Sequence, residues 1–307
     1  MRWSACLLLV LPAAALIWLG LGDADRGPAA AGPRLAAADS GADAAACRKR
    51  RQAIGRRLRA EFGEHDFTLV CVPPFVVIGD EAPAVVRQRA QRTVGWAVRL
   101  LKRAYFDRDP DRALAVWLFA DRASYRRHCR ALFHTEPDTP FGFYSAEHDA
   151  LIMNIATGGG TLVHEIVHPY VEANFPGCPA WFNEGLGSLY EQCGERDGRI
   201  VGFTNWRLAG LQEAIRAGEL PPLTRLLATS SHQFYNRDPG TNYAQARYLL
   251  YYLQQRGKLR AFYKAFHAAR RKDPTGQATL KRILDQPDLA AFQQQWEAWV
   301  LKLSFSG

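Results

Sequence analysis

Two histidines spaced four residues apart give this sequence its strongest chemical signal. They are the ends of the segment His164-Glu165-Ile166-Val167-His168. In a helix, residues four apart lie on one face, so both imidazoles can reach a single Zn²⁺. Glu165 would project beside that metal, where it can take a proton from a water molecule. The apolar residues between them give such a helix a side that faces the core.

A carboxylate further along the chain completes a plausible ligand set. Glu184 follows His168 by 16 positions and lies in a stretch, beginning near Pro179, that we expect to be a second helix. Two histidines and one glutamate make a catalytic zinc site with a fourth position open for water, whereas structural zinc sites fill all four positions. We therefore predict Zn²⁺ bound by His164, His168 and Glu184, with Glu165 as general base.

The two segments that carry these residues, HEIVH and WFNEGLGSLYE, resemble the gluzincin side of the zincin metallopeptidases. More narrowly, they are similar to the peptidase-MA-like proteins. The resemblance is specific around residues 161–191, covers roughly 67–303, and includes a Tyr/Ala-rich stretch at 243–257. It implies a zincin-like fold and zinc-dependent hydrolysis of a peptide or protein substrate, with the same ligands and the same base.

The chain departs from the family pattern at several positions. The interval before Glu184 is shorter than in thermolysin-like enzymes. Ser188 stands four residues after Glu184, where those enzymes place an acid that supports a zinc-bound histidine. Pro169 crowds the carbonyl of Glu165 and should kink the helix. Glu191, seven residues after Glu184, would share its helix face, and could either support a ligand or be exposed.

Hydrolysis also needs a hydrogen-bond donor for the developing oxyanion. Tyr243, Tyr190 and His232 are the candidates, and we favour Tyr243. The remaining histidines show no partner spacing and are expected to be ordinary: His65, His128, His134, His148 and His267.

The first 46 residues differ from the rest of the chain. Residues 1–22 contain an almost uncharged apolar run typical of a signal peptide or an N-terminal membrane anchor. Residues 23–46 are rich in Ala, Gly, Asp and Pro, and are expected to form a flexible linker. This organisation predicts export to the periplasm or cell envelope, with possible membrane association through the N-terminus. The folded domain should span 47–307.

Charge and cysteine content limit the partners. The formal net charge is +9, with a basic cluster at 48–60. No zinc finger, aromatic RNA-binding motif or helix-turn-helix accompanies it, so we expect a solvated basic helix and no nucleic acid. Apart from Cys6, five cysteines remain, an odd number that leaves at least one thiol unpaired or paired between chains. A bridge between Cys178 and Cys193 would brace the segment around Glu184, but their connectivity stays open.

The composition, 48% hydrophobic and 22% charged, is that of a globular protein. Strand patterns occur at 67–78, 113–120 and 141–155, the last as a hairpin, and helix patterns at 84–106, 122–133, 161–168, 179–192, 206–217, 243–255, 259–269 and 289–303. We predict an α+β fold: a small mixed sheet with the active-site helix in one lobe (about 65–175), followed by a mostly helical lobe (about 176–307). Strand 151–155 could pair with an extended substrate as an edge strand.

Two other functions fit parts of the sequence. A zinc-stabilised binding or scaffold protein of the envelope would have the metal without turnover, and its fourth coordination position would be filled or occluded. A basic binder of membrane surfaces or nucleic acid would show strong salt dependence and no effect of chelators. The sequence indicates neither the substrate sequence nor an oligomeric state.

Overall fold

The computed structural model describes residues 39–63 and 66–306. The expected signal or anchor segment and the linker up to residue 38 lie outside this described part. The predicted linker boundary at residue 46 is wrong, because helix α1 (Asp39–Phe62) already begins at Asp39. Alanines in the first turns favour helix, and a narrow stripe of Cys47, Ile54 and Leu58 is buried. Within the described residues, no helix has the length and apolar character needed to cross a membrane.

A five-stranded mixed sheet forms the first half of the molecule, with strand order β1-β2-β3-β5-β4. The strands are β1 (Thr68–Val72), β2 (Phe75–Gly79), β3 (Leu114–Phe119), β4 (Gly142–Ser145) and β5 (Ala150–Asn154). The central strands β2, β3 and β5 run parallel, and β1 and β4 are antiparallel edges. The central strands are buried at every position, as expected for a sheet covered on both faces.

The predicted hairpin at 141–155 is confirmed as β4 and β5, but its position in the sheet differs from the prediction. β5 pairs with β3 on one side and β4 on the other, so β5 is an internal strand. The strand with a free side at this end of the sheet is β4. Hairpin patterns define which strands pair locally. They do not define which of the two then joins the rest of the sheet.

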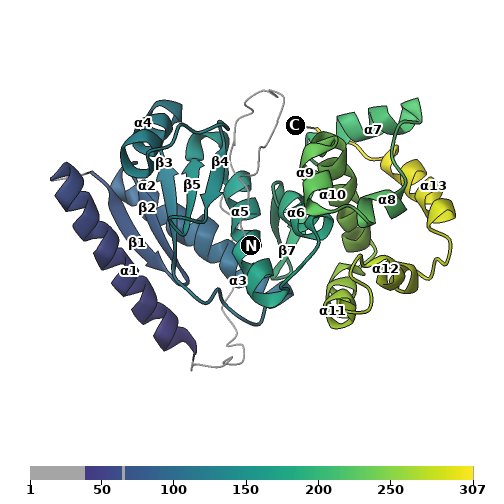
Figure 1. Ribbon diagram of the computed structural model, residues 1–307, viewed down its shortest axis with the longest axis horizontal. Coiled ribbons are helices and arrows are strands. Elements are labelled where there is room, and N and C mark those ends of the chain that lie inside the picture. The colour runs from purple at the N-terminus through teal and green to yellow at the C-terminus, as the bar shows by residue number, and fades with distance from the viewer. Residues whose placement is uncertain (1–38, 64–65, 307) are drawn as a thin grey trace.

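Helices cover both faces of the sheet (Figure 1). Alternate residues of each strand point to opposite faces, and they form two hydrophobic clusters. One cluster lies beneath α1 and α4 (Arg122–Phe133). The other lies beneath a helical run and α5 (Gly159–Asn174). That run was expected as one helix over 84–106 and is α2 (Pro83–Arg89), a π-helical turn η1 (Ala90–Gly95) and α3 (Trp96–Ala104). Asp121 caps α4, since its side chain accepts from the Ser124 N–H at 2.8 Å.

The second half of the molecule is helical, as predicted, apart from one hairpin. After a short 3₁₀ turn η2 (Ile155–Thr157) and α5 come α6 (Ala180–Leu189), β6 (Cys193–Arg196), β7 (Arg199–Gly202), α7 (Arg207–Ala217), α8 (Leu223–Leu227), α9 (Ser231–Asn236), α10 (Pro239–Gln255), α11 (Leu259–Ala269), α12 (Gln277–Leu284) and α13 (Leu289–Val300). α6 packs against both α5 and α10. The core cluster under α5 therefore continues into this lobe, and α5 and α6 lie at the junction of the two halves (Figure 1). The coarse α+β architecture is as the sequence predicted.

Candidate metal centre

Helix α5 holds His164 and His168 at the centre of the molecule. The predicted helix starts after Gly158 and continues through Pro169 to Asn174, so the proline does not end it. Most of its residues are buried because the sheet lies on one side and α6 on the other. A Cβ atom at Gly160 would collide with the backbone carbonyl of Glu191. A glycine at the start of α5 thus permits the close approach of the loop that follows α6.

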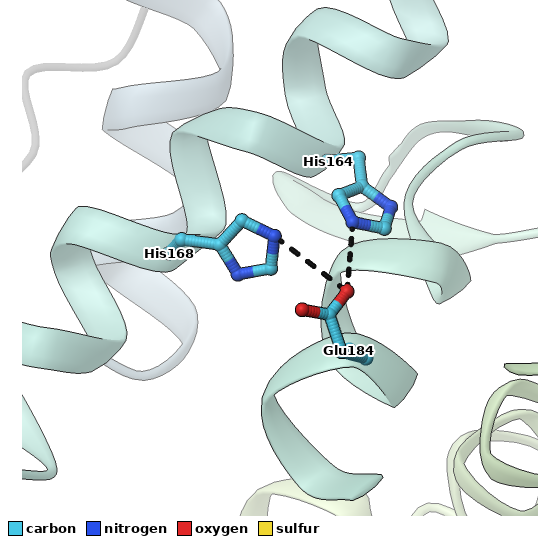
Figure 2. A group of neighbouring side chains, drawn as sticks. All are labelled: His164, His168 and Glu184. Carbon is cyan, nitrogen blue, oxygen red and sulfur yellow. Dashed lines mark hydrogen bonds and ion pairs between the residues drawn. The ribbon is translucent and has the colours of Figure 1, made fainter. Parts of the chain in front are cut away.

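The three predicted ligands converge, two from α5 and one from α6 (Figure 2). His164 Nε2 lies 3.2 Å from Glu184 Oε2, and His168 Nε2 lies 3.7 Å from the same oxygen. One ligand atom from each residue falls within 4.8 Å of the others. A tetrahedral ion with bonds of about 2.0–2.1 Å requires ligand atoms roughly 3.3 Å apart. The two nitrogen–oxygen separations, 3.2 and 3.7 Å, are close to that value, so the side chains fit such an ion once the two imidazoles adjust their spacing.

Outer hydrogen bonds orient both imidazoles. His164 Nδ1 lies 3.2 Å from Glu191 Oε1, and His168 Nδ1 lies 3.0 Å from Asn183 Oδ1. Carboxylate and amide oxygens accept, so each Nδ1 carries a proton and each Nε2 is directed toward Glu184. In the metal-free protein His164 Nε2 also donates to Glu184 Oε2, and it would release that proton to bind an ion. Metal-binding histidines commonly have such a second partner, which sets tautomer and ring orientation. This arrangement is a second reason why the residues fit a metal ion.

Glu191 is the support for His164 that the sequence left open. It follows the end of α6 and is buried. Arg207 donates to both of its carboxylate oxygens, at 2.7 and 2.9 Å, and Asn205 Nδ2 donates at 3.1 Å. Ser188, four residues after Glu184, is fully buried and its hydroxyl has no hydrogen-bond partner in the described part of the chain. The acid that supports the ligand therefore stands seven residues after Glu184.

Tyr235 is a contact that the sequence analysis missed. Its hydroxyl donates to Glu184 Oε1 at 2.7 Å, which leaves Oε2 directed at the imidazoles. Tyr235 lies on α9, a helix the sequence analysis did not predict. A signal was present, because Ser230 and Gln233 form a capping box at its start.

Opposite charges determine the electrostatics of this cluster. Burial alone would raise the pKa of Glu184, but His168 and His164 outweigh it and lower that pKa to about 2. Burial alone would lower the pKa of His164, but Glu184 and Glu191 outweigh it and raise that pKa to about 10. The ionised Glu184 and Glu191 provide the negative charge that a divalent cation requires, and the proton of His164 is its competitor.

The other predicted site residues differ in their placement. Glu165 is buried next to His164 on α5 and is not one of the three clustered ligands. Tyr243 is buried on α10, and its ring stacks at 6.5 Å, centroid to centroid, on the ring of His164. Tyr190 is directed elsewhere, with its hydroxyl bonded to that of Tyr105 at 2.7 Å. His232 is exposed on α9. Of the three oxyanion candidates, Tyr243 is the one stacked on a ligand.

The remaining sequence expectations concern cysteines, charge and other histidines. The five described cysteines are free thiols, so the suggested Cys178–Cys193 bridge is not formed. The basic cluster lies on α1 with most of its arginines exposed. His65 lies outside the described residues. The other four histidines expected to be ordinary, at 128, 134, 148 and 267, are not part of the His164–His168–Glu184 group.

Comparison with protein-family models and with curated protein sequences gives no match.

Proposed function

We propose that this protein is a zinc-dependent peptidase with a zincin-like, gluzincin-type site. One observation carries the proposal: two Nε2 atoms and a carboxylate oxygen converge from α5 and α6, and both Nδ1 atoms are already engaged. His164, His168 and Glu184 would hold the ion. When bound, zinc would supply Lewis acidity, lowering the pKa of a water molecule and polarising a carbonyl.

The protein's own residues would move the protons. Glu165 would accept the proton of the attacking water and deliver it to the leaving amine, a task for a carboxylate beside the ligands rather than among them. Tyr243 would donate a hydrogen bond to the oxyanion that develops on the scissile carbonyl. Tyr235, by holding Glu184 Oε1, would keep that carboxylate monodentate and correctly directed.

An extended peptide would bind along β4. The sequence analysis gave this role to residues 151–155, but β5 already has partners on both sides. β4 lies at the edge of the sheet, and it is one of the elements that α5 contacts. Main-chain groups on its free side can pair with a substrate backbone without regard to side-chain identity. This mode of binding favours peptides or unfolded protein segments over small molecules.

The decisive experiment is the substitution Glu165→Gln. We expect the variant to retain one zinc per chain, measured by atomic emission, and to lose cleavage of a peptide library by at least about 10³-fold. Glu172→Gln is the matched control, because Glu172 is exposed on the same helix. Undiminished cleavage by the Glu165→Gln variant would rule out the mechanism.

The same measurements test the other readings of the sequence. A protein that binds zinc stoichiometrically but cleaves no library peptide, with or without chelator, would be a metal-stabilised scaffold. A protein that binds no zinc would leave a basic surface binder as the remaining candidate. Library cleavage that is abolished by chelator and restored by zinc supports the peptidase.

A further inference from the structure

Cys47 and Cys71 lie where α1 packs against the sheet. Cys47 is fully buried on α1, and Cys71 lies on the edge strand β1. The side chains of Leu69 and Cys71 join the cluster under α1, whereas those of Val70 and Val72 join the cluster on the other face. The strand alternation therefore directs Cys71 toward the helix that carries Cys47.

The sulfur of Cys47 is held at the hairpin between β1 and β2. Its thiol donates to the carbonyl of Phe75 at 3.0 Å, and Cys71 packs against the same hydrophobic cluster that contains Cys47. A disulfide requires the two sulfur atoms to approach to about 2.05 Å. Cys47 and Cys71 lie on a helix and a strand that contact each other and share one hydrophobic cluster, so side-chain rotation can bring the two sulfur atoms together.

The apolar packing of α1 is a narrow stripe of Cys47, Ile54 and Leu58. Arg50 and Arg57 add hydrogen bonds to the backbone carbonyls of His148 and Leu132. Beside the stripe, a pocket of about 280 Å³ remains between α1 and the body, lined among others by Arg50, Arg57 and Trp117. A largely polar, basic helix that leaves such a gap gains little from apolar burial. A covalent link would contribute what the packing does not.

We propose that Cys47 and Cys71, which are free thiols in this structure, are oxidised to a disulfide bond that fastens α1 to β1. This inference does not depend on the proposed peptidase activity. The oxidant is a disulfide compound. The partly exposed Cys71 attacks it as a thiolate, forms a mixed disulfide and releases one thiol. Cys47, as a thiolate, then attacks the sulfur of Cys71 and releases the second thiol. The two electrons and two protons lost by the cysteines are those gained by the oxidant, which ends as two thiols.

The burial of Cys47 and the partial exposure of Cys71 determine which thiol attacks first. Burial, and then the neighbouring Cys71, raises the pKa of Cys47 to about 12. A thiol that rarely ionises is a poor first nucleophile, so Cys47 acts second, when the sulfur it attacks is already beside it.

The test uses the full chain, reduced and then exposed to oxidised glutathione, with remaining thiols blocked before trypsin digestion. The bond joins the tryptic peptides 35–48 and 60–87, which mass spectrometry detects as one species that reductant separates. Oxidation should also raise the melting temperature by about 5–10 °C, because the link closes a loop of roughly 25 residues in the unfolded chain. Both effects should vanish in Cys71→Ala.

Cys129→Ala is the matched control, since Cys129 is buried in the same hydrophobic cluster. It should retain the joined peptides and the rise in melting temperature. The proposal is overturned if folded, oxidised protein yields Cys47 and Cys71 separately blocked, if Cys71 remains a glutathione adduct, or if either cysteine joins a different one. Because Cys71 is partly exposed, its alanine variant tests the link even where Cys47→Ala does not fold.

Discussion

At the scale of single residues, two tyrosines near the metal centre have separable roles. Tyr235 touches a ligand, Glu184, whereas the ring of Tyr243 stacks on the ring of His164. We expect Tyr235→Phe to weaken zinc affinity about tenfold, because the loss of an outer partner has an effect of that size. We expect Tyr243→Phe to retain zinc affinity and to lower kcat by about 10²-fold, because an oxyanion donor acts in the transition state. Competition with a chromogenic chelator and steady-state kinetics measure the two effects.

Tyr252→Phe is the control for both tyrosine variants. Tyr252 lies on the same helix as Tyr243 but contacts Phe292 and Trp299. Its substitution should change neither the zinc affinity nor kcat. Equal losses of zinc affinity in the Tyr235 and Tyr243 variants would show that Tyr243 only supports the ligands.

Glu191 determines how the metal-free protein responds to acid. Burial would raise its pKa, but Arg207, followed by His164, outweighs burial and lowers the pKa well below its usual range. A lowered pKa in the folded state contributes stability above the pKa of the unfolded chain, near 4.3, and this contribution is lost as the pH falls. We expect Glu191→Gln to lower the unfolding free energy by about 2–4 kcal/mol at pH 7 and by less at pH 3, where the unfolded chain is protonated but the folded carboxylate is still ionised. Urea denaturation of chelator-treated protein measures the unfolding free energy at both pH values.

Glu213→Gln is the control for charge loss, because Glu213 is exposed on α7. It should leave stability within about 0.5 kcal/mol at either pH. A Glu191→Gln deficit that does not shrink between pH 7 and pH 3 would contradict the proposed linkage.

At the scale of elements, the contact between the start of α5 and the loop after α6 depends on Gly160. An alanine there collides with the backbone carbonyl of Glu191, which is the residue that orients His164. We expect Gly160→Ala to cost about 1–3 kcal/mol of stability, as overpacking does, and to weaken zinc binding. Gly210→Ala is the opposite case, because nothing lies near the added methyl group. In the interior of α7 it should stabilise by about 0.5–1 kcal/mol. Urea denaturation measures the unfolding free energy of both variants. Equal changes would contradict the close approach of Gly160 to the Glu191 carbonyl.

Local patterns predicted most helices and the clustering of His164, His168 and Glu184, because both depend on short spacings. His164 and His168 share a helix face, and a carboxylate sixteen residues later returns to them on α6. The cap at Asp121 was readable for the same reason. The β6–β7 hairpin was missed although Asp197-Gly198, both at positive φ, is a typical turn signal; its four-residue strands carry little periodicity.

The rest depends on contacts that no local pattern encodes. Arg207 and Tyr235 come from the segments after β7 and on α9, and only the folded chain brings them to Glu191 and Glu184. The internal position of β5 and the meeting of Cys47 with Cys71 are likewise matters of tertiary arrangement. The helix at 39–46 was missed because its composition also suits a linker, and only its docking on the sheet decides between them.

At the scale of the whole molecule, the candidate metal centre lies where the two halves of the chain meet. α5 packs against the sheet's covering helices, and α6 packs against α10 of the helical lobe. The ligands are contributed from both sides of this junction. An ion bound there links two elements whose separation would accompany unfolding, so its binding energy adds to the stability of the entire fold.

Zinc should therefore raise the melting temperature of the whole protein in one transition. At a free concentration 100-fold above its dissociation constant, a ligand that binds only the folded state adds about 2.7 kcal/mol. For a chain of this size that corresponds to roughly 5 °C. Calorimetry with zinc, then with chelator, measures the shift, and Mg²⁺ should fail to replace zinc because it prefers oxygen ligands. Glu184→Ala should abolish the shift, since it removes the one ligand that comes from α6. If zinc raised the melting temperature of Glu184→Ala by the full amount, the ion would bind elsewhere. It would then not link α5 to α6.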